Sequence, residues 1–183
     1  QMLLAQFQEE QAAIRSLTQQ SPSLLSMLSE GITEDFPIPE PEEMLSDLQS
    51  RMINDFPVSD PTPSFTVKDV VPSLEPYSAP AFYLTTPLGD SDNNVIYINR
   101  RNSPMGLELY TTLAHEGFPG HLYQTVYSNR AFLDKDMDPV RKLIWYGGYL
   151  EGWALYVEFI SYDYAADLLE QSGQSDAAQA ALL

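Results

Sequence analysis

Two histidines and a glutamate lie close together in the sequence His-Glu-Gly-Phe-Pro-Gly-His, residues 115–121. His115 and His121 are the only histidines among 183 residues, and Glu116 directly follows the first of them. Imidazole is the commonest side-chain ligand of zinc, and a glutamate beside a zinc-activated water is a ready general base. These residue types therefore predict a metal-dependent hydrolytic site with zinc as its cofactor.

The spacing of the two histidines differs from the common H-E-x-x-H signature, in which positions i and i+4 share one helix face. Six residues on a regular helix leave two side chains about 120° apart. Proline removes a helical hydrogen bond and glycine allows unusual backbone conformations, so Pro119 and Gly120 are expected to break the helix and bring His121 back toward His115. The same spacing also fits two polar residues that flank a helix kink and bind no metal.

A catalytic zinc site needs a third protein ligand and an open position for water. Because the chain has no cysteine and no third histidine, that ligand must be Asp or Glu. The candidate is Glu151, in an apolar stretch that ends with Glu158, seven residues later on the same helix face. A glutamate in an apolar helix needs a partner. A metal is one such partner; solvent, or an ion pair with Arg141 or Arg130, is the alternative.

The helices that position these residues follow from hydrophobic periodicity. Amphipathic patterns predict helices near residues 3–20 and 41–56, and another that begins after Gly106 and leads into His115. A last long helix is predicted from about Val140 to Leu169. This helix carries both candidate glutamates.

The middle of the chain has a different character. Ten of the 14 prolines lie between Pro37 and Pro87, which excludes a long helix there. Three segments rich in β-branched and aromatic residues predict the short strands of a small sheet: 65–71, 82–85 and 95–99. The sequence thus predicts one α+β, mainly helical domain, with helices in 1–60, a small sheet and Pro-rich loops in 61–104, and metal-binding helices in 105–170.

Composition excludes several classes of partner. The net charge is −17, from 26 acidic and 9 basic side chains, and such a surface repels nucleic acid. No run of 18 apolar residues is present, so no membrane-spanning segment is expected. The absence of cysteine excludes disulfides and leaves the cellular compartment open.

The paired motifs HEGFPGH, at 115–121, and EGWALYVE, at 151–158, strongly resemble those of the bacterial family called domain of unknown function, number 885. Its members carry H-E-x-x-P-G-H and a downstream E-G-W-A-x-Y-x-E. The segments VPSLEP at 71–76, AFYLTTPL at 81–88 and VIYIN at 95–99 are also similar to that family. The resemblance implies a gluzincin-type zinc-peptidase core with a small sheet beside the metal-binding helices. Because full-length members are several times longer, it also implies a fragment of a larger protein.

The resemblance assigns roles residue by residue. It implies that His115, His121 and Glu151 are the metal ligands, that Glu116 is the general base, and that Glu158 supports a ligand from behind. Asn99 matches the asparagine that ends the strand before the motif helix. Since an edge strand there pairs with extended substrate in zinc peptidases of this build, residues 95–99 are expected to flank the cleft and Asn99 to contact the substrate.

Groups that stabilise the transition state come from later parts of the chain in related peptidases, and this chain ends at Leu183. Tyr149, Tyr156 and Tyr162 are local candidates, although tyrosines on a helix more often belong to the core. The rest of the parent protein is expected to pack on this fragment. Many members of the family that this chain resembles look like secreted lipoproteins. The resemblance therefore favours an extracellular or cell-surface location over a cytoplasmic one.

The expected activity is zinc-dependent hydrolysis of peptide bonds, with one zinc ion per chain and Glu116 as general base. Three alternatives stay open at this point. The first is a zinc hydrolase of another amide or ester. The second is a metal-free surface or binding module that keeps the motif as structure. The third is a folded piece that binds zinc but is inert alone.

Overall fold

The computed structural model describes residues 2–20, 23–24, 26–27, 36–87, 92–134, 138, 140, 144 and 146–183. In these ranges the chain is mainly helical and contains one three-stranded sheet, as the predicted α+β class requires. The elements in chain order are α1 (Met2–Gln20), α3 (Pro41–Arg51), η1 (Met52–Asn54), β1 (Thr66–Asp69), η2 (Glu75–Tyr77), β2 (Ala81–Leu84), β3 (Val95–Ile98), α4 (Gly106–Glu116), α5 (His121–Asp134), α7 (Gly147–Gln171) and α8 (Ser175–Ala181).

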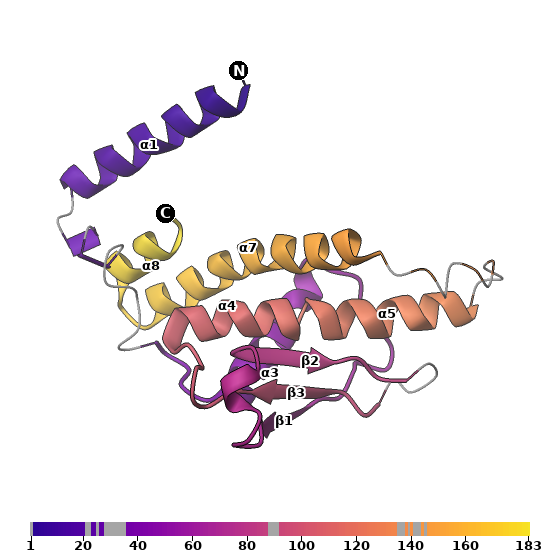
Figure 1. The fold of residues 1–183 in the computed structure, drawn as a ribbon. Helices are drawn as coiled ribbons and strands as arrows, with labels where there is room; N and C mark the ends of the chain where they lie inside the picture. The colour runs from indigo at the N-terminus through magenta and orange to yellow at the C-terminus, as the bar shows by residue number, and fades with distance from the viewer. Residues whose placement is uncertain are drawn as a thin grey trace.

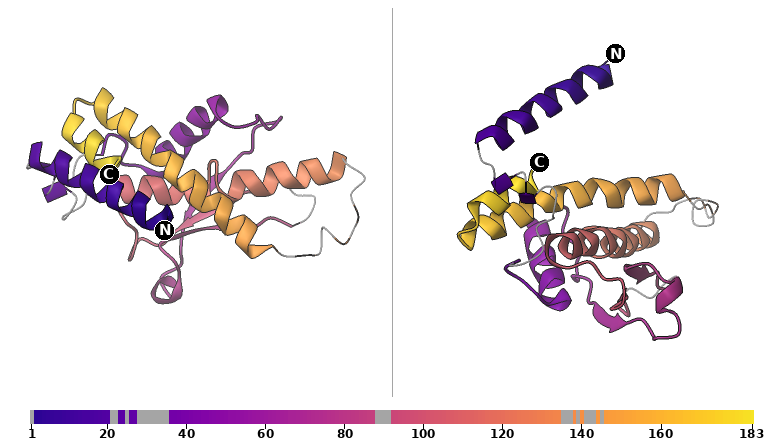
Figure 2. Two further views of the ribbon diagram at one scale, coloured as in Figure 1. Left: turned by 90° about the horizontal axis from the view of Figure 1, so that it is seen from above. Right: turned by 60° about the vertical axis from the view of Figure 1, so that its left-hand side comes forward.

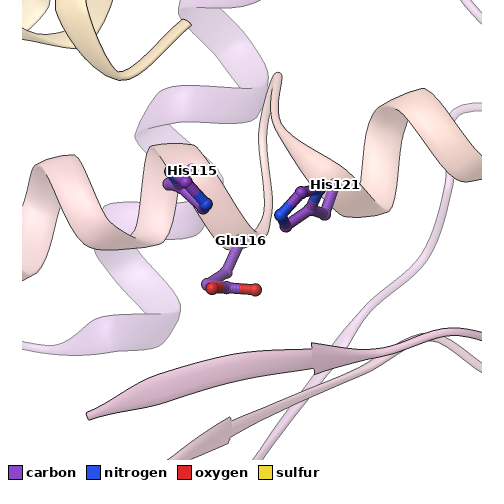
Figure 3. A group of neighbouring side chains, drawn as sticks. All are labelled: His115, Glu116 and His121. Carbon is purple, nitrogen blue, oxygen red and sulfur yellow. The ribbon is translucent and has the colours of Figure 1, made fainter. Parts of the chain in front are cut away.

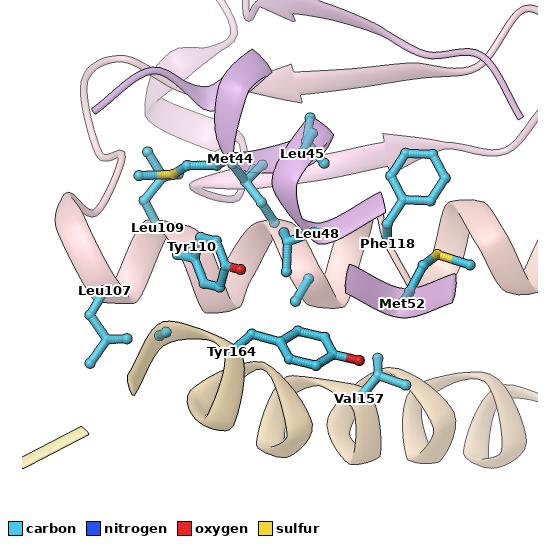
Figure 4. Close-up of a cluster of buried hydrophobic side chains, with 14 of the residues drawn as sticks. Met44, Leu45, Leu48, Met52, Leu107, Leu109, Tyr110, Phe118, Val157 and Tyr164 are labelled. Atoms are coloured by element: carbon cyan, nitrogen blue, oxygen red, sulfur yellow. The ribbon is translucent and has the colours of Figure 1, made fainter. Parts of the chain in front are cut away.

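Helix α3 is the central packing element of the N-terminal half. Pro41 occupies its first turn, where the missing N–H costs nothing, and two acidic residues in that turn complement the helix dipole. Met44, Leu45 and Leu48 form a stripe that is at most 1% exposed. This stripe and Met52 of η1 pack into a core that α4 and α7 complete (Figure 4).

The sheet has the order β1-β3-β2, so β3 is central. Strand β3 runs parallel to β1, with Thr66 opposite Val95, and antiparallel to β2, with Tyr83 opposite Ile96. The three strands lie within two residues of the predicted segments. Alternate residues of β3, Ile96 and Ile98, are fully buried under the helices.

Three layers stack in the body of the molecule, as Figures 1 and 2 show. Helices α4 and α5 run end to end as a middle layer, with α7 on one side and the sheet on the other. Helix α1 is separate from these layers in Figure 1 and in the right-hand view of Figure 2. The junction between α4 and α5 therefore lies between α7 and the edge of the sheet.

Helix α7 begins later than predicted. Tyr146, the residue before it, has φ −107° and ψ 69°, which are not helical, so a continuous helix cannot extend back to Val140. The helix starts at Gly147 and continues past Leu169 to Gln171. Part of the predicted start, residues 141–143 and 145, lies outside the described residues. None of the helices in the described ranges has the length and apolarity needed to cross a bilayer.

Candidate metal centre

The junction between α4 and α5 brings the two histidines together. Helix α4 ends at Glu116 and α5 begins at His121, and residues 117–120 leave the helical path between them (Figure 3). A Cβ atom on Gly120 would overlap the carbonyl oxygens of Ala114 and His115, so only glycine allows this close approach. The imidazole centroids lie 4.8 Å apart with their planes nearly perpendicular. The expected break at Pro119-Gly120 is therefore present, and it makes the i, i+6 spacing compatible with one shared site.

Helix α7 supplies the carboxylate that faces both imidazoles. Oε2 of Glu151 lies 3.6 Å from Nε2 of His115 and 3.5 Å from Nε2 of His121. These separations are too long for good hydrogen bonds. Two atoms that bind one zinc ion at about 2.0–2.1 Å in tetrahedral geometry are about 3.4 Å apart. The distance from Oε2 of Glu151 to each imidazole nitrogen is thus close to that between two ligands of one ion.

Glu158, the second candidate glutamate on α7, contacts the Nδ1 atom of His115, on the side of the ring away from Glu151. Oε2 of Glu158 lies 3.0 Å from Nδ1 of His115. When Nδ1–H donates this hydrogen bond, the lone pair of Nε2 is directed toward Glu151 and His121. The structure thus places Glu158 beside His115, and its role in supporting a metal ligand stays a prediction.

Glu116 lies on the sheet side of the same cluster. The backbone N–H of Tyr83 in β2 donates a 2.9 Å hydrogen bond to Oε2 of Glu116. Burial raises the pKa of the Glu116 carboxyl, while this hydrogen bond and the two neighbouring histidines act in the opposite direction. One ligand atom each from His115, Glu116 and His121 lie within 4.8 Å of one another, so Glu116 is also close enough to bind a metal. Oε2 of Glu116 already accepts a backbone hydrogen bond, whereas Oε2 of Glu151 lies 3.6 and 3.5 Å from the two imidazole nitrogens, so Glu151 is the better candidate for the ligand.

A pocket of about 310 Å³ opens over this cluster. The residues that line it come from β2 and the segment after it, from the α4–α5 junction, and from the start of α7: Tyr83, Thr85, His115, Glu116, His121, Thr125, Leu150 and Glu151. Glu151 is 64% exposed, so the pocket opens to solvent on the α7 side. A small molecule in this pocket would therefore contact the histidines and Glu116 at the same time.

Asn99 does not contribute to this pocket. It is fully buried, its side-chain amide donates to the carbonyl oxygens of Glu75 and Ser78, and its side-chain oxygen accepts from the N–H of Arg101. These bonds fix the chain around η2 and leave no group for a substrate. The structure therefore does not place Asn99 where a substrate could contact it, contrary to the prediction.

The strand beside the site is also different from the expected one. β3 is paired on both sides and lies in the centre of the sheet, so residues 95–99 cannot pair with a substrate. β2 is the edge strand, and it contacts Glu116. Residue patterns along the chain do not indicate this order, because it depends on pairing between distant segments.

Two contributors to the site were not expected from the sequence. Tyr83 acts through its backbone N–H, which no residue type can reveal. The indole N–H of Trp153 donates a 2.8 Å hydrogen bond to the carbonyl oxygen of Pro119, so it ties the 117–120 segment to α7. The tyrosines proposed as transition-state donors, Tyr149, Tyr156 and Tyr162, do not line the pocket.

Comparisons with known proteins agree with this fold. The family described as "Bacterial protein of unknown function (DUF885)" matches residues 3–181. A crystal structure described as that of the putative lipoprotein from Colwellia psychrerythraea has a similar fold, with a TM-score of 0.58 and 23% sequence identity. The similarity covers 78% of this chain but 23% of that one, so the chain spans less than a quarter of that protein's length. No curated protein matches the chain.

Proposed function

The chain belongs to the bacterial family of unknown function DUF885, and we propose that within this family it forms the zinc-binding core of a metallopeptidase. The observation that supports this most directly is the convergence of three potential ligand atoms. Oε2 of Glu151 lies 3.6 Å from Nε2 of His115 and 3.5 Å from Nε2 of His121, separations that would suit ligands of one ion. The pocket beside these atoms would leave room for a water molecule or a substrate.

The donor set suits zinc chemistry. Two neutral imidazoles and one carboxylate, without any thiolate, are a common ligand set of catalytic zinc. Zinc held in such a set polarises a substrate carbonyl and lowers the pKa of a bound water toward about 7. Glu151 and the two histidines would hold the ion, and Glu158 would keep the ring of His115 in the required tautomer.

Glu116 is the general base in this proposal. Its carboxylate accepts the proton of the attacking water, the water oxygen bonds to the peptide carbonyl carbon, and the same proton then passes to the nitrogen of the leaving amine. The N–H of Tyr83 keeps the carboxylate beside the histidines during both transfers. The edge strand β2 is then the segment along which an extended peptide would lie.

The first test is the zinc content of the purified protein after zinc is offered and excess ions are removed. We expect one zinc ion per chain in the wild type and none in Glu151→Ala. Glu170→Ala is the matched control, because Glu170 is an exposed glutamate on the same helix, remote from the pocket. A wild-type chain that binds no zinc, or a Glu151→Ala chain that binds as well as the wild type, would contradict the proposed ligand set.

The second test concerns the reaction. A mixed peptide pool is incubated with zinc-loaded protein, and the products are identified by mass spectrometry. Glu116→Gln should keep zinc and lose hydrolysis, since an amide cannot accept the proton. Cleavage of amides or esters in place of peptides would favour a different hydrolase with the same site. Zinc binding with no hydrolysis of any of these would favour a piece that needs the rest of the protein.

A cell-surface location is part of the proposal. Its support is the description of the structurally similar Colwellia protein as a lipoprotein. Fractionation of cells that produce the whole protein, followed by protease treatment of intact cells, tests it. Protection of the protein from external protease would contradict it.

A further inference from the structure

Gln124 of α5 carries a buried amide that nothing in the fold explains. Its side chain is only 5% exposed, and neither Nε2 nor Oε1 has a hydrogen-bond partner within the described part of the chain. An amide left in this state destabilises the fold, because the loss of its hydrogen bonds to water is not compensated. Buried polar groups of native proteins are usually paired, so an unpaired one calls for a functional reason.

The two candidate histidine ligands differ in their support. Nδ1 of His115 meets Glu158. His121 contacts Glu151 through Nε2, and no partner for its Nδ1 is found among the residues that the structure describes. Metal-binding histidines almost always donate their second ring N–H to an oxygen atom, which fixes the tautomer and the ring orientation. His121 therefore needs an acceptor that the ligand set does not provide.

Gln124 is a neighbour of His121 on the surface of α5. It follows His121 by three residues on α5, and residues at i and i+3 are neighbours on a helix surface. Thr125, the next residue, lines the pocket. We infer that Gln124 is the positioning residue of His121: its Oε1 accepts the Nδ1–H bond, after a small side-chain rotation or through one buried water, and so holds Nε2 toward Glu151. This inference rests on the proposed zinc site and gives His121 the support that Glu158 gives His115.

Replacement of Gln124 by methionine separates this role from a merely structural one. Methionine has a similar volume and no amide, so Gln124→Met should leave the metal-free protein as stable as before or more stable. If Gln124 positions His121, the dissociation constant for zinc should nevertheless rise about 10- to 100-fold. A dissociation constant equal to that of the wild type would overturn the inference.

Two further variants serve as a rescue and as a control in the zinc titration. Gln124→Glu restores an oxygen acceptor and should recover affinity to within a few-fold of the wild type. Gln49→Met is the matched control, because Gln49 makes a 2.8 Å bond to the carbonyl oxygen of Pro63 and does not line the metal pocket. It should weaken folding and leave zinc affinity unchanged.

A measurement without metal decides the inference even if the zinc proposal fails. His115 and His121 are the only histidines, so ¹⁵N-labelled histidine gives two sets of ring signals. At about pH 9, where imidazole is neutral, His121 should carry its proton on Nδ1 in the wild type and lose that preference in Gln124→Met. His115 should be unchanged. The same His121 tautomer in both proteins would overturn the role of Gln124, whereas a wild type that binds no zinc but shows this difference would overturn only the zinc site.

Discussion

At the scale of single residues, the contact between Glu158 and His115 decides how well the site is prepared for a metal. A carboxylate is a stronger acceptor for Nδ1–H than an amide, so it increases the basicity of Nε2. The contact also explains why a glutamate sits in an otherwise apolar turn of α7.

Glu158→Gln should therefore weaken zinc binding by about tenfold or more without removing a ligand. A competitive titration against a zinc-binding dye measures the change. Glu170→Gln on the same helix should have no effect. An unchanged affinity in Glu158→Gln would mean that the contact does not tune the site.

Residue types revealed part of this site and concealed the rest. Composition limited the third ligand to one of 26 acidic residues, and Glu151 was selected by its apolar surroundings and by the family resemblance. The N–H of Tyr83 and the free amide of Gln124 could not be found in this way. A backbone donor has no sequence signature, and a glutamine in a helix looks like any other helix former.

At the scale of elements, the close approach of α4 and α5 depends on one missing side chain. Gly120→Ala places a methyl group against the carbonyl oxygens of Ala114 and His115, so the end of α4 and the start of α5 must separate. We expect a loss of several kcal/mol in unfolding free energy together with loss of zinc binding. Urea unfolding and zinc titration measure the two effects.

Gly152→Ala is the matched control within the same site region. Gly152 lies inside α7, and a Cβ there meets nothing within 4 Å. Alanine should stabilise the helix by about 0.5–1 kcal/mol and leave zinc binding intact. If both alanine variants behaved alike, the close approach at Gly120 would not be what assembles the site.

Sequence patterns predicted the strands but not their order. β-branched and aromatic residues marked all three strands to within two residues. The expectation that 95–99 flanks the cleft was wrong, because β2 pairs with β3 on that side and is itself the edge strand that contacts Glu116. Strand order depends on pairing between separate segments, and local residue patterns do not specify it.

At the scale of the whole molecule, a bound zinc ion would join α7 to the α4–α5 junction across the core. Any ligand that binds only the folded state raises the free energy of unfolding, by about 2.7 kcal/mol at a concentration 100 times its dissociation constant. We expect zinc to raise the urea midpoint of the wild type and EDTA to reverse the change. Glu151→Ala should show no such increase, and an equal increase in that variant would indicate zinc binding elsewhere.

Stability at alkaline pH depends on three tyrosines of the core. Burial raises the pKa of Tyr123 from 10.0 to about 12. Burial and a hydrogen bond to Asp47 raise the pKa of Tyr110, and burial and a hydrogen bond to Asp55 raise that of Tyr164. Because the unfolded chain releases these protons near pH 10 and the folded chain keeps them, stability should fall as the pH rises from about 10 toward 12.

Tyr123→Phe tests this dependence. The variant loses the 2.6 Å bond to the carbonyl oxygen of Pro57, so it should be less stable at neutral pH but lose less stability between about pH 10 and 12. Tyr77→Phe, at a position that is 87% exposed, is the control and should match the wild type in slope. Urea unfolding at several pH values gives both slopes, and identical slopes for all three proteins would contradict the prediction.

The four residues that leave the helical path between α4 and α5 have an evolutionary consequence. Two more residues separate the candidate ligands here than in the i, i+4 arrangement, yet α4 and α5 still run end to end (Figure 1). Ligand spacing and fold can then diverge independently. A genome search that requires histidines at i and i+4 would overlook sites of this kind, whereas one that admits a Pro-Gly insertion before the second histidine would recover them.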